Sequence, residues 1–233
     1  MLLSRKGSHV CMGKFMKNVM QFFLVFIIGV GLAAAAPAHA KMPSTVPDAA
    51  QSGADSTDAT NIVKDFYSQL LDTMKQGDQL GFAGRYKKLE PAIKNAFNLP
   101  LMTRFAVGLS WSNATSEEQQ QLVSAFSDFS VATYASQFKS WDGESFEIQN
   151  EKPSTEGVIV ETQLKQKSGD PVTLNYLMRK DDQGKWRIVD VFLDGAISEL
   201  AARRSEFSSI VRRDGINALV NSLGTKAKQM GPS

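Results

Sequence analysis

The sequence predicts one α+β domain, with helices first, an antiparallel sheet in the middle and helices at the end. The spacing of the apolar residues leads to this prediction. Apolar side chains recur about every 3.6 residues from Asp58 to about residue 142, and again from Ile197 to Leu223. Between these stretches, from Ser145 to Leu193, they recur about every second residue, which is the spacing of strands.

The first 40 residues have the pattern of a secretory signal peptide. Four basic residues precede an apolar run from Phe22 to Leu32, and the small residues Ala38-His39-Ala40 follow it. The run is short for a membrane span and no stop-transfer pattern comes after it, so we expect cleavage after Ala40. A retained membrane anchor is the alternative.

Residues 41–57 are small, polar and contain proline, with no apolar spacing, so we expect a disordered linker there and a single domain over residues 58–230. Removal of residues 1–40 leaves 22 basic and 24 acidic residues, a net charge of −2. A near-neutral exported protein has no overall charge that favours nucleic acid.

Cysteine and histidine are absent after the signal peptide, because the only examples are His9, Cys11 and His39. The mature chain therefore has no disulfide, thiolate nucleophile, imidazole base or zinc site of Cys and His. We expect no catalytic residue, no metal and no cofactor. A hydrolase would need an unusual Ser-Lys mechanism, and Ser136-Gln137-Phe138-Lys139 lacks the accompanying S-D-N and K-T-G elements.

Three helices are expected before the longest one. They cover residues 58–76, 85–97 and 100–108, each with apolar residues at helical spacing. Gly77 ends the first, and Pro91 kinks the second or marks a boundary within it. Pro100 suits the first turn of the third.

The longest helix is expected to start after Thr115-Ser116-Glu117-Glu118, a capping box in which Thr115 and Glu118 bond each other's backbone amides. Asp142-Gly143 is expected to end it. Its apolar arc includes Phe126, Phe129 and Tyr134 and is broader than one neighbouring helix needs.

Four runs are expected to pair as an antiparallel meander: Ser145–Asn150, Gly157–Lys167, Val172–Lys180 and Lys185–Leu193. The last run is apolar on both sides, which predicts cover on both faces. Trp186, Ile188 and Phe192 form one side, and Val189, Val191 and Leu193 the other. Asp190 interrupts the first set and is expected as a buried or pocket-edge carboxylate. Beyond Gly195 two further helices follow, separated by Asp214-Gly215.

Residues spread over most of positions 60–225 resemble the periplasmic phospholipid-binding family of the toluene-tolerance and Mla transport systems. The resemblance is carried by Trp186, Asp190, Gly195, Ser198, Arg204, Phe207, Gly215 and Leu219, with upstream support from Arg104, Gly108, Trp111, Gln119, Phe126, Phe129 and Tyr134. Residues 194–207 look like the branch associated with hopanoid biosynthesis, named HpnM. The general family more often has an aromatic residue where Arg203 stands.

The resemblance implies a periplasmic carrier that holds phospholipid or hopanoid tails in an apolar cavity between its sheet and its helices. It also implies membrane-bound transport partners and transient contact with a membrane surface. The expected lipid-binding residues are Phe66, Leu70, Phe105, Phe126, Phe129, Tyr134, Val160, Leu164, Leu174, Tyr176, Ile188, Ile197, Leu200 and Phe207. Apolar stripes of this kind more often simply fill a core.

Arg203-Arg204 and Arg212-Arg213 are basic pairs on one expected helix. Solvated surface and favourable charge near a helix C-terminus explain them without a function. The sharper hypothesis is that Arg203 and Arg204 meet anionic headgroups at the cavity mouth or an acidic docking partner. The alternative to a carrier is a non-enzymatic adaptor subunit of a hopanoid or envelope complex, with a filled core and no cavity beneath the sheet.

Overall fold

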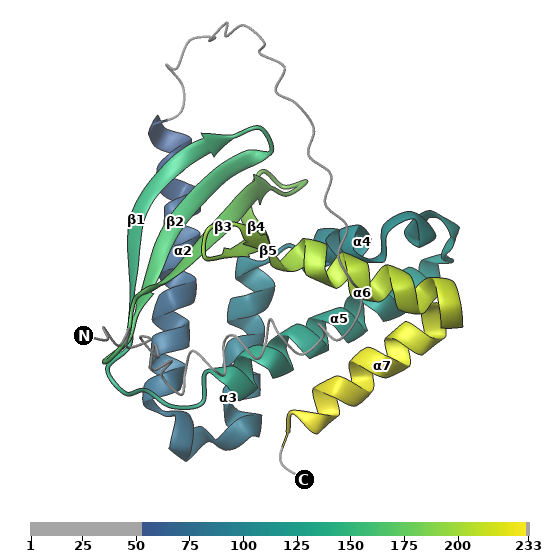
Figure 1. Ribbon diagram of the computed structural model, residues 1–233, viewed down its shortest axis with the longest axis horizontal. Helices are drawn as coiled ribbons and strands as arrows, with labels where there is room; N and C mark the ends of the chain where they lie inside the picture. The colour runs from purple at the N-terminus through teal and green to yellow at the C-terminus, as the bar shows by residue number, and fades with distance from the viewer. Residues whose placement is uncertain (1–52, 232–233) are drawn as a thin grey trace, which may run out of the picture.

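The computed structural model describes residues 53–231 (Figure 1). The expected signal peptide and residues 41–52 of the expected linker lie outside this range. The elements are α2 (Gly53–Lys75), α3 (Gly77–Ala96), α4 (Leu99–Val107), the 3-10 helix η1 (Gly108–Asn113), α5 (Ser116–Gln137), β1 (Ser145–Ser154), β2 (Gly157–Lys165), β3 (Val172–Lys180), β4 (Trp186–Leu193), β5 (Ile197–Ser198), α6 (Glu199–Asp214) and α7 (Ile216–Gln229). The α+β prediction is confirmed, and α2 begins five residues before Asp58.

The five strands form one antiparallel sheet in the order β1-β2-β3-β4-β5. β1 and β2 are the longest pair and curve around α2 (Figure 1). Helix α2 contacts β1, β2 and β4, so it lies across the sheet. The fifth strand, of two residues, was not expected from the sequence because so short a run has no readable alternation.

A bulge at Val189 changes which side chains of β4 face the core. Leu177 pairs with Asp190 but Met178 pairs with Ile188, so Val189 is an extra residue in β4. One extra residue reverses the alternation beyond it. The expected grouping of Ile188 with Phe192 was therefore wrong: Ile188 shares the core face with Val191 and Leu193, and Asp190 and Phe192 take the opposite face. Asp190 is buried there, as expected.

The remaining helices pack beside the sheet and α2. Helix α5 lies between α3 and α7, and α4 packs on α6, which in turn contacts β4 (Figure 1). Helix α3 passes through Pro91 without ending there, and its interruption lies instead at Gly81, whose φ is 58°. A glycine tolerates this left-handed conformation and most residues do not.

The capping box of α5 is confirmed. The Glu118 amide donates to Thr115 Oγ1 at 3.2 Å, and the Thr115 amide donates to Glu118 Oε2 at 2.8 Å. The helix ends at Gln137, five residues before the expected end at Asp142. The Arg85 guanidinium donates to Ala135 O and Gly77 O, both at 2.8 Å, and so joins the last turn of α5 to the start of α3.

Candidate ligand-binding cavity

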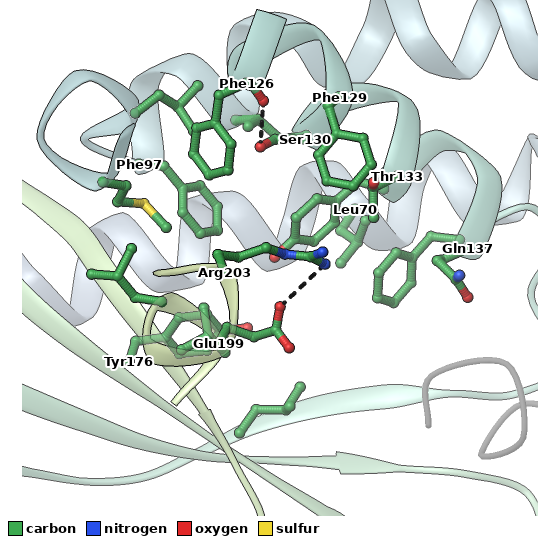
Figure 2. Close-up of a pocket in the computed structure, with 18 of the residues that line it drawn as sticks. Leu70, Phe97, Phe126, Phe129, Ser130, Thr133, Gln137, Tyr176, Glu199 and Arg203 are labelled. Carbon is green, nitrogen blue, oxygen red and sulfur yellow. Dashed lines mark hydrogen bonds and ion pairs between the residues drawn. The ribbon is translucent and has the colours of Figure 1, made fainter. Parts of the chain in front are cut away.

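An apolar cavity of about 110 Å³ lies between the sheet and helices α2 to α6. Its walls are aromatic and aliphatic apart from a few hydroxyl, amide and charged groups. The lining residues are Leu70, Ile93, Phe97, Leu99, Met102, Phe126, Phe129, Ser130, Thr133, Tyr134, Gln137, Phe138, Phe146, Leu164, Leu174, Tyr176, Val191, Glu199, Leu200 and Arg203. Figure 2 shows many of these side chains converging on one space from α5, the sheet and α6.

The structure brings several of the sequence-predicted residues together around this cavity. These are Leu70, Phe126, Phe129, Tyr134, Leu164, Leu174, Tyr176 and Leu200, together with Arg203. They come from five elements that are far apart in the chain, so only the tertiary fold makes them neighbours.

Other predicted residues lie elsewhere. Phe66, Val160, Ile188 and Phe207 are buried in the core outside the cavity wall. They have the same apolar spacing as lining residues, but none of them lines this cavity.

Three more predicted residues lie at the surface. Phe105 is 39% exposed and Ile197 54% exposed. Helix α4 buries the face containing Met102 and Ala106, which leaves Phe105 outside. Arg204 is exposed too, with its guanidinium close to Gly108 on η1 rather than in the cavity.

Several lining residues were not expected from the sequence. They are Ile93, Phe97, Leu99, Met102, Ser130, Thr133, Gln137, Phe138, Phe146, Val191 and Glu199. Phe138 and Phe146 flank the connection from α5 to β1. No regular spacing of apolar residues there indicates which side chains face the interior. In the sequence, Glu199 looks like an ordinary acidic residue in the first turn of a helix, where the helix dipole favours a negatively charged side chain.

Contacts between aromatic rings fix one wall of the cavity. Tyr134 stacks on Phe138 with a centroid distance of 5.5 Å and meets the edge of Phe66 at 5.5 Å. Tyr67 stacks on Phe146 at 4.2 Å, and its hydroxyl shares a hydrogen bond of 2.5 Å with Thr162 Oγ1. Such ring pairs add to the free energy of burial, so this wall is held in place.

Glu199 and Arg203 place opposite charges in this apolar lining (Figure 2). Arg203 Nη2 lies 3.5 Å from Glu199 Oε2, Nη1 lies 3.3 Å from Glu206 Oε2, and the guanidinium lies over the Phe129 ring at 5.2 Å. The side chains of Glu199 and Arg203 are only 13% and 17% exposed. Burial, together with the charges of Asp190 and Glu206, raises the pKa of Glu199 to about 7 despite the opposing charge of Arg203.

Asp190 holds the start of α6 and thereby positions Glu199 and Leu200. Its carboxylate accepts hydrogen bonds from the Val191 amide at 2.8 Å, the Leu200 amide at 2.9 Å and Ser198 Oγ at 2.5 Å. Burial raises the pKa of Asp190, although these hydrogen bonds lower it. Asp190 is thus a structural anchor, and it does not line the cavity.

Ser130 is one of the polar residues of the cavity wall, and its Oγ donates to Phe126 O at 2.8 Å within its own helix. Within residues 53–231, no three His, Cys, Asp or Glu side chains gather as a metal site. The described helices also include none that is long and apolar enough to cross a membrane. The arrangement suits an apolar ligand with a polar end.

Residues 64–225 match the family model described as MlaC protein. Among solved structures, the fold is similar to a phospholipid-binding protein from Ralstonia solanacearum in complex with a phospholipid. The two sequences are 24% identical, the match covers 74% of this chain and 98% of that chain, and the TM-score is 0.65. Because the family model matches most of the chain, this protein belongs to the MlaC family.

Proposed function

We propose that this protein is a periplasmic lipid carrier, which binds the tails of a phospholipid or hopanoid in the cavity and shuttles them between membrane-bound partners. The apolar cavity between sheet and helices is the main support. The structural relative from Ralstonia solanacearum is itself in complex with a phospholipid. In this proposal residues 1–40 are a cleaved signal peptide and residues 58–230 are the lipid-binding domain.

A carrier is needed because the transfer of lipid tails from a membrane into water is strongly unfavourable. Each buried CH₂ contributes about 0.8 kcal/mol, so a chain of sixteen carbons costs roughly 12 kcal/mol to transfer into water. An apolar cavity offsets that cost without covalent chemistry. The absence of cysteine and histidine after residue 40 supports a carrier rather than an enzyme.

The size of the cavity sets a condition on binding. An engineered apolar cavity of about 150 Å³ in another protein holds benzene. By that measure, about 110 Å³ accepts only a segment of a lipid tail in the present side-chain positions. A whole lipid therefore requires side chains of the cavity wall to move apart. Helix α6, which forms part of this wall, follows the turn at Asp194-Gly195, where both residues have positive φ.

The finer assignment to the hopanoid-associated branch is also a proposal. Its support is the resemblance of residues 194–207, which include Arg203, where the general family more often has an aromatic residue. Arg203 gives this cavity a charged group that an aromatic residue would not supply.

The proposed membrane contact involves the surface formed by α4 and η1. Phe105 and Leu109 are exposed there, and Arg204 packs against η1.

Lipid extraction and mass spectrometry of protein purified from the periplasm test this function. We expect stoichiometric lipid from the unmodified protein, and much less from Ser130→Phe, which fills the cavity. Ser124→Phe is the matched control, because Ser124 is an exposed residue of the same helix. If several preparations of the folded, unmodified protein yield no lipid, the carrier hypothesis fails and the adaptor hypothesis gains.

A further inference from the structure

Glu199 and Arg203 are the charged side chains of the cavity wall, and they differ in how well their charges are compensated. Arg203 lies between two carboxylates, those of Glu199 and Glu206, and over an aromatic face. Lys226 adds a further positive charge beside Glu206. With Glu199 ionised, the two carboxylates match the two cations and Asp190 lies close by, so the cluster offers no excess of positive charge to an anionic headgroup.

Glu199 is the carboxylate of this cluster with the fewest polar contacts. Its one charged contact is the 3.5 Å approach of Arg203, and its carboxylate accepts no hydrogen bond from any residue in the described part of the chain. An ionised carboxylate has about four acceptor sites, so Glu199 keeps acceptor capacity for a ligand that brings N–H or O–H groups into the cavity.

Four titratable groups face the carboxyl of Glu199. The titratable groups around it are Arg203 and Glu206 on α6, Asp190 on β4 and Tyr134 on α5. Burial keeps the pKa of Tyr134 well above its usual value, so its hydroxyl remains protonated beside the cavity. One carboxylate acceptor and one hydroxyl therefore lie together in the otherwise apolar wall of the cavity.

We propose that Glu199 anchors the polar end of the bound lipid and selects headgroups that donate hydrogen bonds from nitrogen or oxygen. This inference rests on the proposed function, since it presumes that tails occupy the apolar part of the cavity. A primary ammonium of the ethanolamine type and a hydroxyl both meet the requirement. A quaternary ammonium has the same charge as a primary one but no N–H, so it does not.

Phosphatidylethanolamine and its N-methylated derivatives separate donor number from charge. With identical acyl chains, the series from no methyl group to phosphatidylcholine keeps the headgroup zwitterionic while its N–H groups fall from three to none. Binding is measured at pH 8 with delipidated mature protein, by displacement of a fluorescent fatty acid. We expect affinity to fall stepwise along the series, by about tenfold in total, which is the loss of about one hydrogen bond.

Variants at Glu199 connect the preference to this side chain. Glu199→Met removes the acceptor and should give equal affinities along the series, and Glu199→Gln, which keeps the size and one acceptor oxygen, should reduce the preference. Glu90→Gln is the control, because Glu90 lies on α3 outside the cavity and should leave the preference intact. Circular dichroism confirms that each variant is folded.

Two negative results have different meanings. If the unmodified protein binds all members of the series equally, or if Glu199→Met keeps the stepwise fall, the selection by Glu199 is refuted while the carrier function stands. If the unmodified protein binds no member of the series and no other lipid, the proposed function itself fails, and this inference fails with it.

Discussion

Replacing Glu199 by Gln should remove a pH-dependent loss of stability. The pKa of Glu199 is about 7 in the folded protein, against 4.5 for an ordinary glutamate, because burial disfavours its charged form. One pKa unit corresponds to about 1.4 kcal/mol, so ionising Glu199 costs about 3 kcal/mol more in the folded than in the unfolded chain.

The sign follows from proton binding. Between pH 4.5 and 7 the folded protein holds a proton on Glu199 that the unfolded chain has released, so the free energy of unfolding falls as the pH rises through this window. Below the window the cost is absent, and above it the cost is constant. The Gln side chain stays uncharged throughout and resembles the protonated acid, so the variant lacks this fall.

Urea unfolding of delipidated protein at several pH values from 4 to 8 measures the difference. We expect similar stabilities near pH 4, and a Glu199→Gln protein that is more stable above pH 7 by up to about 3 kcal/mol. Asp190, whose pKa is also raised by burial, titrates in both proteins. A stability difference that does not change with pH would refute the assigned burial of Glu199.

Further predictions concern the framework that positions the cavity, and urea unfolding at pH 7 checks each of them. Gly77→Ala should destabilise the protein by about 2 kcal/mol or more, because the added Cβ would lie 1.9 Å from Lys139 O. Gly224→Ala is its control, since open space surrounds that helical position, and it should stabilise by about 0.5–1 kcal/mol; equal effects of the two changes would contradict the packing. Asp190→Ala should cost about 2–3 kcal/mol, because two backbone amides and a hydroxyl lose their acceptor, and a cost below about 0.5 kcal/mol would count against this anchor. Thr115→Ala should cost about 1 kcal/mol through loss of the capping box, and an unchanged midpoint would argue against it.

Much of the fold is predictable from the sequence because helices and strands impose different spacings on apolar residues. The capping box at Thr115 and the helix break at Gly215 could be predicted from neighbouring residues alone. At Thr115 a side chain bonds the backbone of the same helix turn, and at Gly215 a glycine takes positive φ. The bulge at Val189 was not predictable, because an extra residue is defined by its pairing with another strand.

The residues that line the cavity could not be predicted from apolar spacing. Apolar spacing indicates that Phe126 and Phe207 are both buried, and it does so for the same reason in each helix. Only the packing of the elements decides that Phe126 borders an empty space and Phe207 does not. The placement of Glu199 in that wall is tertiary as well, since it depends on Asp190 binding the first turn of α6.

The sequence by itself determined the order of the main helices and strands and the resemblance that the MlaC family match bears out. The tertiary structure decided which buried residues line the cavity and which charge lies among them. The physical reason is that hydrophobic burial depends on removal from water, which sequence spacing reports, whereas a cavity depends on how completely side chains from distant segments fill the space between them.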